Sequence, residues 1–159
     1  MKPNTFRRLI NFWPPFMGAG IKVKEISKDF TDVKVEMKLT KLNRNYVGTQ
    51  FGGSIYAMTD PFYMLILMKN LGNDYIVWDK AADIKFKSPG KGKLTAHFNI
   101  SKEKIAEIKA AADKDYKVEP TFKVQVKDEQ GNVVAEVDKL LYVRRKDRKA
   151  AGPKPPKAA

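Results

Sequence analysis

The chain of 159 residues contains no cysteine and one histidine, His97. Without thiols it forms neither disulfides nor thiolate metal sites, and it has no cysteine nucleophile. His97 stands between Ala96 and Phe98 in an alternating segment, so it faces away from the apolar side, and we give it a surface position without a catalytic role. A Ser-His-Asp triad and a histidine-rich metal site are therefore not expected. Acid–base chemistry must use carboxylates, lysine or tyrosine, and we expect neither a metal nor a cofactor.

Long apolar runs are also missing. The uncharged segment 47–59 contains glycines and polar side chains, and it is shorter than the roughly 20 apolar residues of a membrane-spanning helix. The N-terminal segment 1–16 carries charges before and inside its apolar stretch, which is not the pattern of a signal peptide. The sequence therefore predicts a cytoplasmic protein without a membrane span.

Acidic residues are scarce relative to basic ones, with 18 Asp and Glu against 31 Lys and Arg and a net charge of +13. Residues 144–159 account for +6 of this charge and residues 1–143 for the other +7. The end of the chain is rich in Pro, Ala and Lys without apolar periodicity, so we predict a single domain at 1–145 and a disordered basic tail at 146–159. Such a tail either solubilises the protein or makes nonspecific contacts with nucleic acid or membrane headgroups, and the first role is the more common one.

Most of the remaining sequence alternates with a period of two. Apolar residues at helical spacing in 4–13, ended by Pro14 and Pro15, predict a lead-in helix within 1–16. Ser101 is a suitable N-cap for a surface helix at 102–115. Five or six antiparallel strands are predicted, of which the last two form a hairpin, at 21–27, 31–40, 75–87, 94–100, 118–126 and 133–143. The segment 75–87 is either one long strand or two strands joined by a bend.

Residues 53–71 form a helical candidate with hardly any polar stripe, ended by Gly72. Pro61 frees the carbonyl of Ala57, so we expect a kink or break there. A helix that is apolar on every side must be wrapped by a curved sheet, covered by a second subunit, or both. The sequence thus predicts an α+β fold in which an antiparallel sheet curls around a long buried central helix, with an N-terminal helix, one surface helix and a homo-oligomeric assembly.

The loop before this helix and the helix itself carry a spaced motif within NRNYVGTQFGGSIYAMTDPF, residues 43–62. The motif N-x-x-G-x-x-F-G-G-x-x-x-x-x-x-D is formed by Asn45, Gly48, Gly52, Gly53 and Asp60. With the strand order over residues 17–145, it resembles the hotdog-fold thioesterase superfamily. The likeness is to the phenylacetyl-CoA thioesterase type and to a related uncharacterised family of thioesterase-like hotdog domains. The thioesterase type has a histidine before the two glycines, whereas this chain has Phe51, which neither donates a hydrogen bond nor takes a proton.

The resemblance implies an acyl-CoA or related thioester as substrate, its hydrolysis as the reaction, and a dimer or dimer of dimers with the site at the subunit interface. In that arrangement Asp60 faces Gly53 of the partner subunit. Phe51 leaves open a second function, the non-catalytic binding of acyl-CoA or a fatty acid. A third, a basic nucleic-acid-binding module, is favoured only by the tail, because no RNA-reading aromatic motif is present, so nucleic acid is not expected as a partner.

The motif residues suit thioester hydrolysis. The first backbone N–H groups of a helix are unpaired, and Gly52 and Gly53 let a substrate carbonyl approach them to form an oxyanion hole. Asp60 can act as general base or nucleophile, and Asn45 can orient the water or the carbonyl. The candidate catalytic residues are Asp60 and Asn45, and the candidate substrate-binding residues are Gly48, Phe51, Gly52, Gly53 and Ser54.

Each piece also has a purely structural interpretation. Asp60 followed by Pro61 is a good helix start, with the aspartate as N-cap. Asn45 suits a turn, and the glycine pair suits a tight loop-to-helix connection. A lysine cluster either meets the phosphates of coenzyme A or forms a solvated strand face; it consists of Lys85, Lys87, Lys91 and Lys93.

Overall fold

The computed structural model describes residues 1–147, so the predicted basic tail lies outside the described residues from position 148 onward. Six antiparallel strands form one sheet in the order β1-β2-β4-β5-β6-β3. The strands are β1 (Ile21–Ile26), β2 (Asp32–Lys38), β3 (Tyr75–Phe86), β4 (Lys93–Asn99), β5 (Thr121–Lys127) and β6 (Val133–Arg145). The helices are α1 (Pro3–Asn11), α2 (Pro14–Ala19), α3 (Gly52–Ala57), α4 (Phe62–Leu71) and α5 (Lys102–Lys114).

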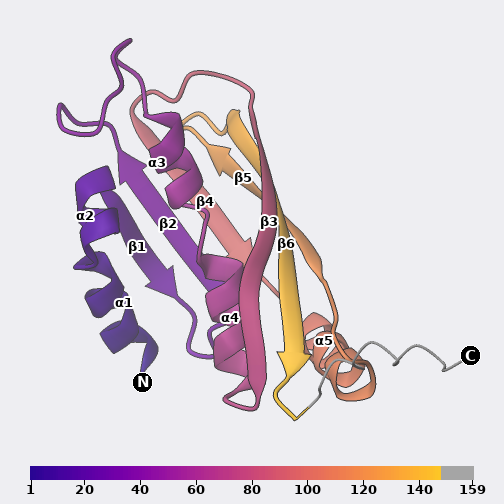
Figure 1. Cartoon of the computed structure of the whole chain (residues 1–159). Coiled ribbons are helices and arrows are strands. Elements are labelled where there is room, and N and C mark those ends of the chain that lie inside the picture. Colours follow the sequence, from indigo (N-terminus) through magenta and orange to yellow (C-terminus); the bar gives the residue numbers. More distant parts are fainter. Residues whose placement is uncertain (148–159) are drawn as a thin grey trace, which may run out of the picture.

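The sheet curls around α3 and α4, which lie on its inner face (Figure 1). Alternation along the strands supplies the core, because every second side chain points towards these helices. In β2, for example, Val33, Val35 and Met37 are buried while the intervening side chains reach the other face. This is the α+β architecture predicted from the sequence, and the predicted hairpin of β5 and β6 is confirmed.

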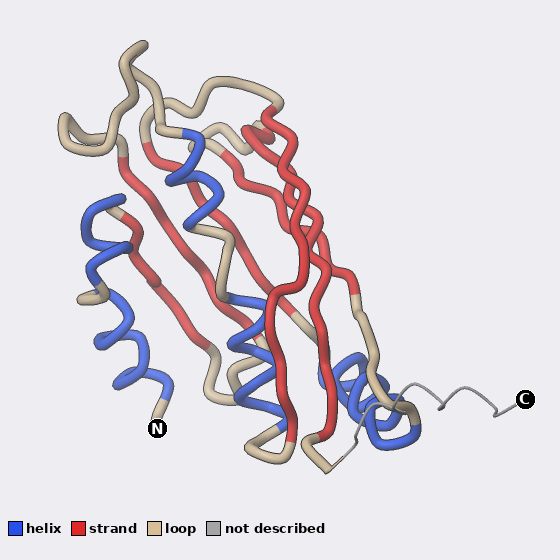
Figure 2. The backbone as a smooth tube through the Cα atoms, in the orientation of Figure 1, coloured by secondary structure: helices blue, strands red, loops and turns tan. Residues whose placement is uncertain are grey.

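The central helix is divided in two. Figure 2 shows α3 and α4 as separate helices joined by a short non-helical link around Pro61. The predicted break is therefore confirmed, and its cause is the missing N–H of proline. Asp60 does not cap the second segment, because α4 begins after Pro61 without any side-chain capping bond, so the N-cap interpretation of Asp60 is wrong.

The region predicted as a single lead-in helix contains two helices. Pro14 and Pro15 end α1 as expected, but they also occupy the first turn of α2, where a missing N–H costs nothing. Asn11 fastens α1 to the sheet edge: its side-chain amide donates to the Val23 carbonyl at 3.0 Å, and its oxygen accepts from the Val23 N–H at 2.7 Å. These bonds cap part of the free edge of β1.

Ser101 is the N-cap of α5, as predicted, and its hydroxyl accepts a hydrogen bond from the Lys104 N–H at 3.2 Å. Replacing Ser101 by alanine is expected to lower the free energy of unfolding by about 1 kcal/mol, because one N–H of the first turn loses its partner. Urea unfolding followed by circular dichroism measures the change, with Ser101→Asp as the control that retains a capping oxygen. Equal stability of the alanine and aspartate variants would contradict this role.

Candidate functional site

The loop that leads into α3 is closed on itself by Asn45. Its side-chain amide donates to Thr49 Oγ1 at 2.9 Å, and its oxygen accepts from the Thr49 N–H at 2.9 Å. Gly48 lies at the turn with a φ of 83°, a conformation that favours glycine. Asn45 and Gly48 thus shape the loop, and the role of Asn45 in orienting a substrate stays a prediction.

Gly52 and Gly53 form the first turn of α3, with Phe51 at the N-cap position. The chain's own hydrogen bonds at this turn begin at the Ser54 and Ile55 N–H groups, both of which donate to the Phe51 carbonyl. Aromatic rings press against both glycines: a Cβ at Gly53 would lie 2.4 Å from the ring of Phe51, and a Cβ at Gly52 would lie 3.1 Å from the ring of Phe86. A side chain at either position would displace one of these rings, both of which belong to exposed phenylalanines.

A hollow of about 690 Å³ opens beside this turn. Its wall combines Asn45 and Gly52 with Lys87 and Lys91 of the turn after β3. Gln50 joins the two segments, because its side-chain amide donates to the Gly92 carbonyl at 3.0 Å. The structure therefore brings part of the motif next to two of the four lysines predicted to meet phosphates.

Phe51 and Ser54 line a different, smaller hollow of about 270 Å³, shared with Asn43 and Arg44 and facing α2. Asp60 lines neither this hollow nor the larger one. Within one chain the predicted site residues are therefore spread over three neighbouring places.

Asp60 sits at the break between α3 and α4, with its side chain 47% exposed rather than enclosed by apolar neighbours. Its Oδ1 accepts from Nζ of Lys139 at 3.2 Å. Lys139 comes from β6, has a fully buried side chain, and also lies 3.2 Å from Oδ2 of Asp79 in β3. The ring of Tyr56 lies 5.4 Å from the same Nζ. One buried ammonium thus holds two carboxylates from different elements beside an aromatic face.

Burial disfavours the charged lysine and by itself lowers its pKa. Asp79 and Asp60 outweigh that effect, so the pKa of Lys139 is raised and the group stays protonated. Burial raises the pKa of Asp79, and the attraction of Lys139 only partly offsets this. Oδ1 of Asp79 is buried without a hydrogen-bond partner. Lys139, Asp79 and Asp60 are therefore held together by charge attraction in a partly desolvated place. Loss of one charge leaves an oppositely charged group without full compensation.

Sequence reasoning missed Lys139 and Asp79, although a signal was present. Val137, Lys139 and Leu141 share the inward register of β6, so the lysine interrupts a buried apolar row. Asp79 continues the inward row of Tyr75 and Val77 in the same way. A charged residue in the inward register of a strand needs a partner of opposite charge. For Lys139, the acid Asp60 near the middle of the central helical segment was such a partner in the sequence.

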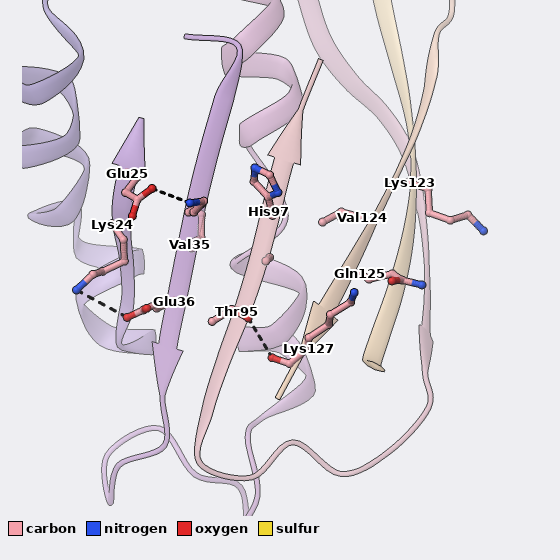
Figure 3. Close-up of a pocket in the computed structure, with 12 residues that line it drawn as sticks. Lys24, Glu25, Val35, Glu36, Thr95, His97, Lys123, Val124, Gln125 and Lys127 are labelled. Carbon is pink, nitrogen blue, oxygen red and sulfur yellow. Dashed lines mark hydrogen bonds and ion pairs between the residues drawn. The ribbon is translucent and has the colours of Figure 1, made fainter. Parts of the chain in front are cut away.

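A broad hollow also lies on the opposite face of the sheet (Figure 3). Its charges largely pair with one another: Lys34 lies 2.8 Å from Glu25, and Lys24 lies 3.8 Å from Glu36. His97 lies here, exposed and bonded to Asp32, which confirms its surface position.

The sequence profile of the domain of unknown function DUF4442 matches residues 3–143. The chain belongs to this family. No curated protein matches the chain. Within the described residues, the family domain contains no helix that is both long and apolar enough to cross a membrane, and no group of three or more metal-binding side chains occurs there.

Solved structures similar to this member of the family are hotdog-fold proteins. A Pseudomonas aeruginosa protein of unknown function, named a probable thioesterase, superposes with a TM-score of 0.82 at 21% identity, over 91% of this chain and 97% of that one. A Haemophilus influenzae thioesterase gives 0.67 at 13% identity, with 91% and 92% covered. The PaaI protein of the Escherichia coli phenylacetic acid degradation operon gives 0.60 at 15% identity, with 89% and 91% covered. These likenesses confirm the predicted hotdog fold and a thioesterase-like architecture.

Proposed function

We propose that the protein hydrolyses an acyl-CoA thioester, with Asp60 as general base or nucleophile. The observation that carries the proposal is the placement of Asp60. Its half-exposed carboxylate lies at the helix break, is paired with the buried Lys139 and does not cap α4. The backbone N–H groups of Gly52 and Gly53 serve as the oxyanion hole, and removing such a donor typically costs a hundredfold to thousandfold in rate (~10²–10³). The structural similarity to a probable thioesterase and to a named thioesterase supports the same reaction.

The proposed site is completed by a second subunit, in which Asp60 faces Gly53 of the partner subunit. Two features support this assembly. The 12-residue strand β3 is an edge of the sheet, and a long free edge invites pairing with another chain. Large apolar side chains of the same region are exposed, among them Phe51, Trp78 and Phe86. A dimer covers both features and brings the separated site residues together.

Lys87 and Lys91 at the rim of the larger hollow are proposed to bind phosphates of coenzyme A. Lys87 lies 3.3 Å from Glu136, so only part of its charge is available to a ligand. The substrate class also implies the cytoplasm as the working compartment. Asn45, Gly48 and Ser54 remain proposed contacts around the acyl thioester.

The second candidate function is non-catalytic binding of acyl-CoA or a fatty acid, and the position of Phe51 favours it. The ring of Phe51 packs over Gly53 where a polar group of the thioesterase type would stand. Such a ring suits an acyl chain and contributes nothing to carbonyl polarisation. This function predicts thermal stabilisation by the ligand without turnover.

A spectrophotometric thiol-release assay with a panel of acyl-CoA chain lengths tests the proposal. Release above the uncatalysed rate, saturable in substrate, is the expected result. Stabilisation by the same compounds without release would establish the binding function instead. If no acyl-CoA of any chain length is hydrolysed or stabilises the protein, both proposed functions are wrong.

Replacing Phe51 by histidine is expected to increase the rate of thiol release about tenfold, because an imidazole can donate a hydrogen bond to the thioester carbonyl. Phe51→Leu is the matched control, since it keeps the position apolar and also removes the ring from Gly53. If the histidine and leucine variants release thiol equally, relief of the ring contact rather than hydrogen bonding is responsible, and this explanation of Phe51 is wrong.

A further inference from the structure

The N-terminal helices carry an apolar face that the rest of the chain leaves uncovered. Leu9, Phe12, Trp13 and Met17 are between 46% and 73% exposed. Leu9, Phe12 and Trp13, together with residues of α4, border an open groove of about 530 Å³ whose lining is almost wholly apolar. Phe6 and Ile10 of α1 are partly buried and also line this groove, whereas Leu9 is exposed. Large apolar side chains gathered in this way mark an interaction surface.

This face is held rigidly against the domain. The two hydrogen bonds between Asn11 and Val23 fix the end of α1. At its start, the ring of Phe6 meets that of Phe30 at 5.8 Å, and Nζ of Lys69 lies 5.2 Å from the Phe6 ring. The exposed side chains therefore belong to a docked helix, whose orientation is set by contacts on its opposite side.

The segment that forms this face carries charges of one sign. Residues 1–24 contain no acidic residue, and the first one in the sequence is Glu25. Lys2, Arg7 and Arg8 belong to α1 or directly precede it, whereas Lys22 and Lys24 of β1 line a hollow on the outer face of the sheet. An apolar strip of Leu, Phe and Trp with Lys2, Arg7 and Arg8 in the same segment is complementary to an anionic lipid surface, which offers negative headgroups above an apolar layer. Tryptophan in particular favours that boundary.

The position of the face also separates it from the proposed dimer contact. Figure 1 shows α1 and α2 beside β1, whereas β3 forms the other edge of the sheet. Phe12 and Trp13 therefore lie next to the sheet edge opposite the one proposed to pair. We propose that α1 and α2 dock the protein on the surface of an anionic lipid bilayer, with Leu9, Phe12 and Trp13 entering the headgroup region. This inference does not depend on thioester hydrolysis.

Sedimentation of the full chain with vesicles tests the proposal. We expect binding to phosphatidylcholine vesicles containing phosphatidylglycerol, little binding to phosphatidylcholine alone, and weaker binding at high salt. The double variant Leu9→Ser/Phe12→Ser is expected to bind at least about tenfold more weakly, because two apolar side chains no longer enter the lipid. Tyr46→Ser is the matched control: Tyr46 is a fully exposed aromatic elsewhere, and both variants keep every charge.

Tryptophan fluorescence locates the contact independently. In Trp78→Phe the remaining Trp13 is expected to shift its emission to the blue on adding anionic vesicles, whereas in Trp13→Phe the remaining Trp78 is not. Unchanged sedimentation of the double variant, or no shift of Trp13, would overturn the proposal, since binding would then be electrostatic only. A change in oligomeric state of the double variant without vesicle binding by the wild type would assign the face to a second copy of the chain.

Discussion

Replacing Asp60 by asparagine is expected to lower kcat for acyl-CoA hydrolysis about a thousandfold, because the amide neither takes a proton nor attacks the thioester. The fold should survive the change. The side chain is half-exposed, α4 begins without its help, and Lys139 keeps the carboxylate of Asp79 as a partner. Steady-state thiol release measures the rate, and thermal unfolding measures the stability of the same preparation.

The matched control for this variant is Asp138→Asn. Asp138 has the same exposed fraction as Asp60, 47%, and is likewise paired with a lysine, Lys123, at 3.3 Å. It follows the outward register of β6, so its loss removes a lysine–carboxylate pair away from the site, although Lys123 is exposed and Lys139 is buried. A variant at Asp60 that turns over as fast as the one at Asp138 would remove Asp60 from the mechanism, whatever the wild type hydrolyses.

Replacing Lys139 by methionine is expected to lower the free energy of unfolding by about 3 kcal/mol at neutral pH. Methionine fills the buried space, so the loss is mainly electrostatic. Asp60 can turn to solvent, but Asp79 is only 19% exposed and already has one buried oxygen without a partner. Without the ammonium its carboxylate is left as an unpaired charge in a desolvated place. Chemical denaturation at constant pH measures the difference.

The pH dependence of this difference has a definite sign. Burial raises the folded-state pKa of Asp79 above the ordinary 3.8, and losing Lys139 raises it further. A raised carboxyl pKa means that the folded state gains a proton more readily than the unfolded chain. The variant therefore gains stability relative to wild type as the pH falls from neutral towards 4. On the alkaline side the Lys139 pKa is raised above 10.5, so its contribution persists up to that pH and is lost above it.

A double variant separates charge from packing in this cluster. Lys139→Met together with Asp79→Leu removes both buried charges and leaves apolar side chains, so we expect most of the lost stability to return. If the double variant is no more stable than Lys139→Met alone, the loss comes from packing, and the electrostatic account of the cluster fails.

Much of the fold could be read from the sequence because the local patterns are strong. The alternation Val33, Val35, Met37 specifies which face of β2 is buried, whatever strands lie next to it. Ser101 caps α5 through a bond to a residue only three positions away. The break at Pro61 is likewise local, since it depends on one missing N–H. The start of α2 at Pro14 was missed because proline both ends one helix and opens another.

The candidate site also has features set by local sequence and features set by the tertiary structure. The sequence by itself determined the spacing of Asn45, the two glycines and Asp60, and it excluded cysteine chemistry, because these are properties of composition and order. Only the tertiary structure decided what Asp60 does in the fold. Its partner Lys139 lies 79 positions away, and that lysine reaches both Asp60 and Asp79 only because β6 and β3 are neighbours in the curled sheet. Alternation marks such a residue as inward, but which charge it meets depends on strand order, which no short stretch of sequence encodes.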